Sequence, residues 1–70
     1  MQIATNMKAL REQKGIFQEE LAVLSGVPRG TIARIENNVD NPKIEPCLKI
    51  AKVLGTTCEK LAYGEDYPEN

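Results

Sequence analysis

Residues 18–37 read QEELAVLSGVPRGTIARIEN, and this stretch decides the fold of the 70-residue chain. Its apolar residues recur at helical spacing on either side of a short turn: Leu21, Ala22, Leu24, Ile32 and Ile35. Gly26 suits the left-handed backbone conformation that ends many helices. Pro28 fixes its own φ and turns the preceding residue away from the helical region. The pattern therefore predicts two helices, over residues 18–25 and 28–37, that cross steeply around the turn.

Helical periodicity also dominates outside this stretch. Two further sets of residues each share one helical face: Ile3, Met7, Leu10 and the stem of Lys14 over residues 3–14, and Ile44, Leu48, Ala51 and Leu54 over residues 44–54. Thr57 can cap a last short helix over residues 58–63. No stretch alternates apolar and polar residues as a strand would. The sequence therefore predicts an all-α, compact fold of five helices with short connections.

Seventy residues are enough for one domain, which we place at residues 1–64. The tail over residues 65–70 is acidic, contains Pro68, and is expected to be mobile. The net charge is −1 and the sequence pI is about 5.3, whereas nucleic-acid-binding domains are often strongly basic. Residues 1–63 nevertheless carry nine basic and seven acidic groups, a net charge of +2. A nucleic-acid binder with this balance must rely on a few well-placed cations.

The composition argues against several other classes of protein. No apolar run approaches the roughly 18 residues of a membrane span, and the N-terminus lacks the pattern of a secretory signal, so we expect a cytoplasmic protein with no membrane partner. The chain has no histidine, and we expect Cys47 and Cys58 to be small buried apolar side chains, with no metal and no cofactor. Without a glycine-rich phosphate loop or a carboxylate pair, we expect no enzyme.

Residues 18–37 have the pattern of a helix-turn-helix unit, which lays its second helix in the major groove of DNA. Arg29 and Arg34 face outward on that second helix. A guanidinium can bond O6 and N7 of guanine together, so both are candidates for reading bases. Gly30 would let the backbone come close to a base or a sugar. The alternative for each arginine is an ordinary solvated helix face.

The chain from about residue 7 to residue 64 resembles the phage repressor and Cro type of helix-turn-helix domain, also called the xenobiotic-response-element family. The matching segments are QEELA at 18–22, SGV at 25–27, TIARIEN at 31–37, NP at 41–42 and LKIAKVLGTT at 48–57. The resemblance implies a five-helix, repressor-like DNA-binding domain with a central helix-turn-helix. It also implies a homodimer that binds a two-fold symmetric operator.

The same resemblance implies roles for individual residues. It gives base-facing positions to Pro28, Arg29, Gly30 and Arg34. It gives contacts with the DNA backbone to Gln18, Thr31, Asn37 and Lys43. For Thr31 and Asn37 the alternative is a local hydrogen bond to the protein backbone.

The resemblance also pairs Arg11 with Glu36 in an internal salt bridge between the helices over 3–14 and 28–37. The sequence departs from the family at Phe17 and Pro28, which stand where a hydroxyl side chain usually caps each helix of the unit. Each lost cap costs on the order of 1 kcal/mol.

These expectations describe a sequence-specific, double-stranded DNA-binding transcriptional regulator, a repressor that binds a palindromic operator as a homodimer. The alternative is a protein-interaction module of the same fold, of the antitoxin or anti-regulator type, with a regulatory protein as its partner and DNA binding secondary. The low net charge favours the alternative. Tyr63 is a candidate for the dimer contact or for a cap on the domain's own core.

Overall fold

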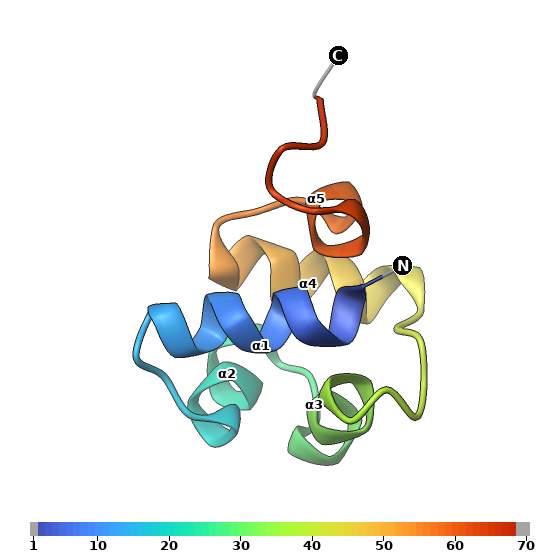
Figure 1. Ribbon diagram of the computed structural model, residues 1–70. Helices are drawn as coiled ribbons and strands as arrows, with labels where there is room; N and C mark the ends of the chain where they lie inside the picture. Colours follow the sequence, from blue (N-terminus) through green and yellow to red (C-terminus); the bar gives the residue numbers. More distant parts are fainter. Residues whose placement is uncertain (1, 69–70) are drawn as a thin grey trace.

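The computed structural model describes residues 2–68, which contain five α-helices and no strand. The helices are α1 (Ile3–Gln13), α2 (Gln18–Ser25), α3 (Arg29–Glu36), α4 (Ile44–Leu54) and α5 (Cys58–Tyr63). In Figure 1, α2 and α3 lie at one end of the molecule, α5 lies at the other end, and α1 and α4 lie between them. The predicted all-α, five-helix fold is confirmed. The bounds predicted for α2, α4 and α5 are right. Helix α1 ends one residue earlier than predicted, and α3 begins one residue later and ends one residue earlier than predicted.

Local chemistry explains where the helices begin. Thr57 Oγ1 accepts a hydrogen bond from the Lys60 N–H at 3.1 Å, so Thr57 caps α5 as predicted. Phe17 has no side-chain acceptor, but the Glu20 carboxylate accepts from the Phe17 N–H at 3.1 Å. This bond is one half of a capping box and replaces part of the missing cap on α2. Pro28 precedes α3 as its N-cap residue and makes no side-chain cap.

The apolar core draws on all five helices and on the turn between α2 and α3. Its buried members are Ile3, Met7, Leu21, Val27, Ile32, Ile35, Cys47, Ile50, Ala51, Leu54 and Leu61. Leu21 and Ile32 are 0 % exposed, so the contact between α2 and α3 is dry at its centre. Full burial of one such side chain stabilises the fold by about 1.5–3 kcal/mol. The core therefore fixes the crossing of the two central helices.

The structure corrects the predicted apolar face of α4. Ile44 and Leu48 were expected in the core, but they are 69 % and 56 % exposed. Ala51 and Leu54 are buried as predicted, and Cys47 and Ile50 are buried in place of the other two residues. Both sets have helical spacing, so the sequence offers two possible stripes. The helix is rotated so that the stripe beginning at Cys47 faces the core.

A buried salt bridge connects α1 to α3. Arg11 Nε donates to Glu36 Oε2 at 2.7 Å, and Arg11 Nη2 donates to Glu36 Oε1 at 3.0 Å. The two side chains are only 9 % and 2 % exposed. This hydrogen bonding raises the pKa of Arg11 above its ordinary value. The helical periodicity of the sequence places Leu10 and the stem of Lys14 on the apolar face of α1, yet Arg11 is the buried residue in that turn.

Two further hydrogen bonds complete this buried cluster, which we call the Arg11–Glu36 clamp. Arg11 Nη1 donates to the Ile16 carbonyl at 2.8 Å, in the loop before α2. Gln18 Nε2 donates to Glu36 Oε1 at 3.1 Å, at the first residue of α2. Within residues 2–68 no buried side-chain nitrogen or oxygen lacks a partner, which is the condition for tolerating a buried ion pair. The clamp therefore connects α1, the following loop, α2 and α3.

The opposite end of the molecule is held by hydrogen bonds between α5 and the start of the chain. The Gln2 N–H donates to the Ala62 carbonyl at 3.0 Å, and Asn6 Nδ2 donates to the Leu61 carbonyl at 2.8 Å. These bonds fix α5 against α1, away from α2 and α3 (Figure 1). The domain thus leaves α3 uncovered by α5.

The segment after α5 makes local contacts in its described part. Thr56 Oγ1 donates to Glu65 Oε1 at 3.2 Å, and the rings of Tyr63 and Tyr67 stack with their centroids 5.0 Å apart. Residues 69–70, the end of the tail over residues 65–70, lie outside the described residues. The mobility of that tail stays a prediction.

The clamp predicts a large loss of stability when one partner is removed. Glu36→Ala should lower the free energy of unfolding by about 3–5 kcal/mol, because Arg11 would remain buried without its counter-charge. Urea unfolding followed by circular dichroism measures the loss. Glu45→Ala is the control, since it breaks the exposed pair with Lys49 at 3.2 Å and exposed pairs contribute little. An unchanged unfolding midpoint for Glu36→Ala would contradict the prediction.

Candidate nucleic-acid interface

The turn between α2 and α3 is held by the side chain of Ser25. Its Oγ donates to the Leu21 carbonyl at 2.6 Å and accepts from the Val27 N–H at 3.2 Å. Gly26 takes φ of +75°, which allows the chain to reverse directly after α2. Val27 is 3 % exposed and anchors the turn in the core. These contacts fix the direction in which α3 begins.

Arg34 lies in the last turn of α3 and is paired with an acidic residue beyond the helix. Its Nε donates to Asp40 Oδ2 at 2.5 Å, and its Nη2 donates to Asp40 Oδ1 at 3.3 Å. The hydrogen bond from Arg34 lowers the pKa of the Asp40 carboxyl below its ordinary value. Both side chains are more than half exposed. The sequence did not indicate Asp40, because it is the sixth residue after Arg34 and lies in the loop beyond the end of α3.

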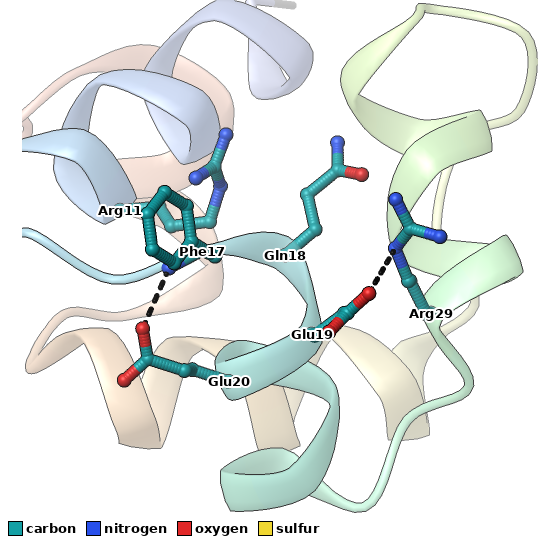
Figure 2. Close-up of a pocket in the computed structure, with 6 residues that line it drawn as sticks. All are labelled: Arg11, Phe17, Gln18, Glu19, Glu20 and Arg29. Atoms are coloured by element: carbon teal, nitrogen blue, oxygen red, sulfur yellow. Dashed lines mark hydrogen bonds and ion pairs between the residues drawn. The ribbon is translucent and has the colours of Figure 1, made fainter.

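Arg29 is the first residue of α3 and has a much looser partner. Its Nε lies 4.0 Å from Glu19 Oε1, and the side chains are 61 % and 76 % exposed. Figure 2 shows this pair, with the Gln18 side chain between Arg11 and Arg29 in the view. Both residues of the pair line a surface hollow of about 430 Å³. The hollow is also lined by Phe17 and Glu20. The interface therefore has two arginines, one held by hydrogen bonds and one with only a distant charge partner.

The residues expected to contact the DNA backbone are distributed around α3. Thr31 and Lys43 line one hollow of about 490 Å³, together with Asp40. Asn37 is exposed at the C-terminal end of α3. Within residues 2–68 the side chains of Thr31 and Asn37 form no hydrogen bond. The local backbone bond considered as their alternative is absent from this structure.

Gly30 lies inside α3 at an open position. A Cβ atom built there would have nothing within 4 Å. Gly30 is the second residue of α3, and a glycine in a helix costs up to about 1 kcal/mol relative to alanine. Packing within the domain therefore gives no reason for glycine at this position. Pro28, the other small base-facing candidate, is exposed at the start of the helix.

The cysteines offer little chemistry. Cys47 is buried and Cys58 is half-buried, so the expected burial holds fully for Cys47 alone, and both are free thiols. Burial raises the pKa of the Cys47 thiol to about 12, which disfavours the reactive thiolate. Among the described residues, no three acidic, cysteine or histidine side chains come together as metal ligands. Over the same residues, no helix has the length and apolar character needed to cross a membrane.

Comparisons with known proteins place the chain in a family. The sequence pattern of the helix-turn-helix family matches residues 7–61. An uncharacterized HTH-type transcriptional regulator of Haemophilus influenzae is 49 % identical over 47 residues, which are 67 % of this chain and 48 % of that protein. Antitoxin HipB of Escherichia coli K12 is 42 % identical over 53 residues, which are 76 % of this chain and 60 % of that protein. The chain thus spans about half to three-fifths of the length of these two relatives.

A solved structure agrees with the fold. The solution structure of the DNA-binding domain of the P22 c2 repressor superposes with a TM-score of 0.85 at 24 % sequence identity, covering 100 % of this chain and 92 % of that one. The match of residues 7–61 covers most of the chain, and relatives above 30 % identity cover more than two thirds of it. The chain therefore belongs to the helix-turn-helix family of DNA-binding transcriptional regulators, of the phage repressor and Cro type.

Proposed function

We propose that this chain is a sequence-specific binder of double-stranded DNA, a transcriptional repressor that occupies a palindromic operator as a homodimer. The observation that carries the proposal is that α3 has one buried apolar side and one exposed basic side. Ile32 and Ile35 are buried on one side of the helix, and Arg29 and Arg34 are exposed on the other. Such a protein acts in the cytoplasm by binding alone, without a cofactor and without catalysis.

In this proposal α3 enters the major groove and α2 lies across the DNA backbone. Arg29 and Arg34 read bases, with Pro28 and Gly30 close to the groove wall. Gln18, Thr31, Asn37 and Lys43 contact phosphates and set the register of the protein on the duplex. The Gln18 amide donates one N–H to Glu36 and keeps a second N–H that can donate to a phosphate oxygen.

The weak charge of the chain has a consequence for binding. Nonspecific attraction to DNA scales with the number of phosphates that cations neutralise. The whole chain has a net charge of −1, and carboxylates stand beside both arginines of α3. We therefore assign most of the affinity for DNA to a few well-positioned contacts. Nonspecific binding is then weak, and the ratio of specific to nonspecific affinity is high.

The exposed apolar face of α4 supports the homodimer. Ile44 and Leu48 lie four residues apart on this helix and are both mostly exposed, so they form one apolar strip. A dimer would then set its two recognition helices about 34 Å apart, one turn of DNA. Tyr63, which is 62 % exposed, is the second candidate for the contact.

A protein partner is the alternative function, and three observations favour it. The net charge is low for a DNA binder, and a relative that is 42 % identical is named an antitoxin. Exposed apolar side chains also stand on and beside α2: Phe17, Val23 and Leu24. In this alternative the α2 face binds a regulatory protein and DNA binding is secondary.

Selection of bound sites from random duplex DNA tests the proposal directly. We expect a palindromic consensus with half-sites about 10 base pairs apart. The affinity for the selected site should fall steeply with salt, with a slope set by the number of phosphates contacted. A scrambled duplex of the same length is the control. No measurable duplex affinity at low salt would reject the proposal in favour of the protein partner.

Gly30→Ala separates stability from DNA binding. The added methyl group meets open space, so the variant should be more stable by about 0.5–1 kcal/mol, since alanine favours the helix. Its affinity for the selected site should nevertheless fall, because the methyl group would lie between α3 and the groove. Thermal melting and fluorescence anisotropy measure the two effects.

The control for Gly30→Ala is Thr5→Ala, which raises helix propensity at an exposed position of α1. It should stabilise the fold and leave the affinity for DNA unchanged. A stabilised Gly30→Ala protein that binds the selected site as tightly as the wild type would show that the backbone at residue 30 stays away from DNA.

Charged substitutions on α4 test the homodimer. The double variant Ile44→Glu/Leu48→Glu should sediment as a monomer at concentrations where the wild type is a dimer, because like charges would face each other across the contact. Val23→Glu on α2, at a residue 81 % exposed, should leave the dimer intact. If the double variant stays dimeric and Tyr63→Ala is monomeric, the dimer contact lies on α5 and not on α4.

A further inference from the structure

The loop that follows α3 is fastened to the helix by backbone hydrogen bonds. The Val39 N–H donates to the Arg34 carbonyl at 2.9 Å, and the Asn38 N–H donates to the Ile35 carbonyl at 3.0 Å. Asn38 has φ of +60°. Two such bonds around a left-handed residue make a Schellman motif, in which asparagine takes the place of the usual glycine. The Asp40 N–H also donates to the Arg34 carbonyl, at 3.4 Å. The backbone thus holds Asp40 next to Arg34.

The Asp40 carboxylate occupies only one edge of the Arg34 guanidinium. It accepts from Nε and from Nη2, which together form the side edge of the group. A guanidinium has five N–H donors in one plane, so three remain. The adjacent edge, which we call the end edge, presents one N–H from Nη1 and the second N–H of Nη2. Within residues 2–68 this edge has no hydrogen-bond or ion-pair partner.

Two parallel N–H groups on one edge match the O6 and N7 acceptors of guanine. We propose that Asp40 is a positioning residue that fixes the Arg34 guanidinium by its side edge and leaves its end edge free to bind one guanine in each half-site. This inference rests on the proposed function. It adds a residue outside the helix-turn-helix unit to the determinants of specificity.

Arg29 provides the contrast within the same helix. Its Nε is 4.0 Å from Glu19 Oε1, too far for a hydrogen bond. Arg29 is therefore free to rotate until it meets DNA, and it can settle on a base or on a phosphate. Ordering an arginine on binding costs free energy, and a side chain that is already held avoids much of that cost. The geometry assigns the sharper base discrimination to Arg34.

The opposite role for Asp40 is that of a competitor. A carboxylate that sequesters Arg34 would weaken DNA binding, and its removal would strengthen binding to the operator. The two roles predict different outcomes: removal of a positioning carboxylate lowers base discrimination, whereas removal of a competitor strengthens operator binding and keeps the discrimination.

The test compares Asp40→Asn and Asp40→Ser with the wild type and with Arg34→Ala. Affinities are measured for the selected operator, for operators with each base pair changed in turn, and for a random duplex. Arg34→Ala should lose discrimination at one guanine in each half-site. Both Asp40 variants should lose on the order of tenfold discrimination at that same base pair and keep it elsewhere. Their affinity for the random duplex should be unchanged or higher, since one negative charge is gone.

Glu59→Gln is the matched control, because it removes one negative charge from α5, at the far end of the domain from α3 (Figure 1). It should leave discrimination intact at every base pair, and melting curves confirm that each variant is folded. Tighter operator binding with full discrimination in the Asp40 variants would overturn the proposal in favour of a competitor, and wild-type behaviour would overturn it outright. A wild-type protein that selects no duplex would instead reject the proposed function, and this inference with it.

Discussion

The contact between Arg11 and Glu36 holds α1, the following loop, α2 and α3 in one arrangement. Replacing a buried ion pair by apolar residues is often neutral or stabilising, so the pair is better understood as a geometric constraint than as a source of net stability. Arg11 uses Nε and both Nη atoms on Glu36 and on the Ile16 carbonyl. Because these donors have fixed directions, the end of α1, the following loop and α3 can meet in only one way.

This constraint also sets the rotation of α3 about its own axis. A helix of eight residues is not stable alone in water, so tertiary contacts must set its orientation. Ile32 and Ile35 bury one side of α3 in the apolar core, and next to them Glu36 makes its salt bridge with Arg11, which has a defined direction. Arg34 is two residues from Glu36 and therefore points away from the clamp. A domain with a modest core can in this way hold an exposed arginine at a defined angle.

The sequence predicts the helices better than it predicts which residues they bury. Gly26 and Thr57 act through neighbouring residues alone, so the bounds of α2 and α5 follow from local chemistry. The rotation of α4 does not, because the stripes that begin at Ile44 and at Cys47 both have helical spacing, and only packing against the other helices selects one. At the interface, Arg29 and Arg34 could be named from their outward positions. Asp40 could not, since its contact with Arg34 depends on a left-handed asparagine in the intervening loop.

The charge balance and the Asp40 contact point to the same strategy for recognition. A strongly basic surface binds any duplex, and its affinity contains little information about sequence. Here each arginine of α3 stands beside a carboxylate, which weakens long-range attraction to phosphates. In the proposal, Asp40 fixes the plane of the Arg34 guanidinium and leaves two parallel N–H donors on its end edge. Donors in a fixed plane can bond to one base edge and not to the others. In the proposed function, the carboxylates therefore reduce the general affinity for DNA and sharpen the choice among sequences, so that a chain with net charge −1 can select its site.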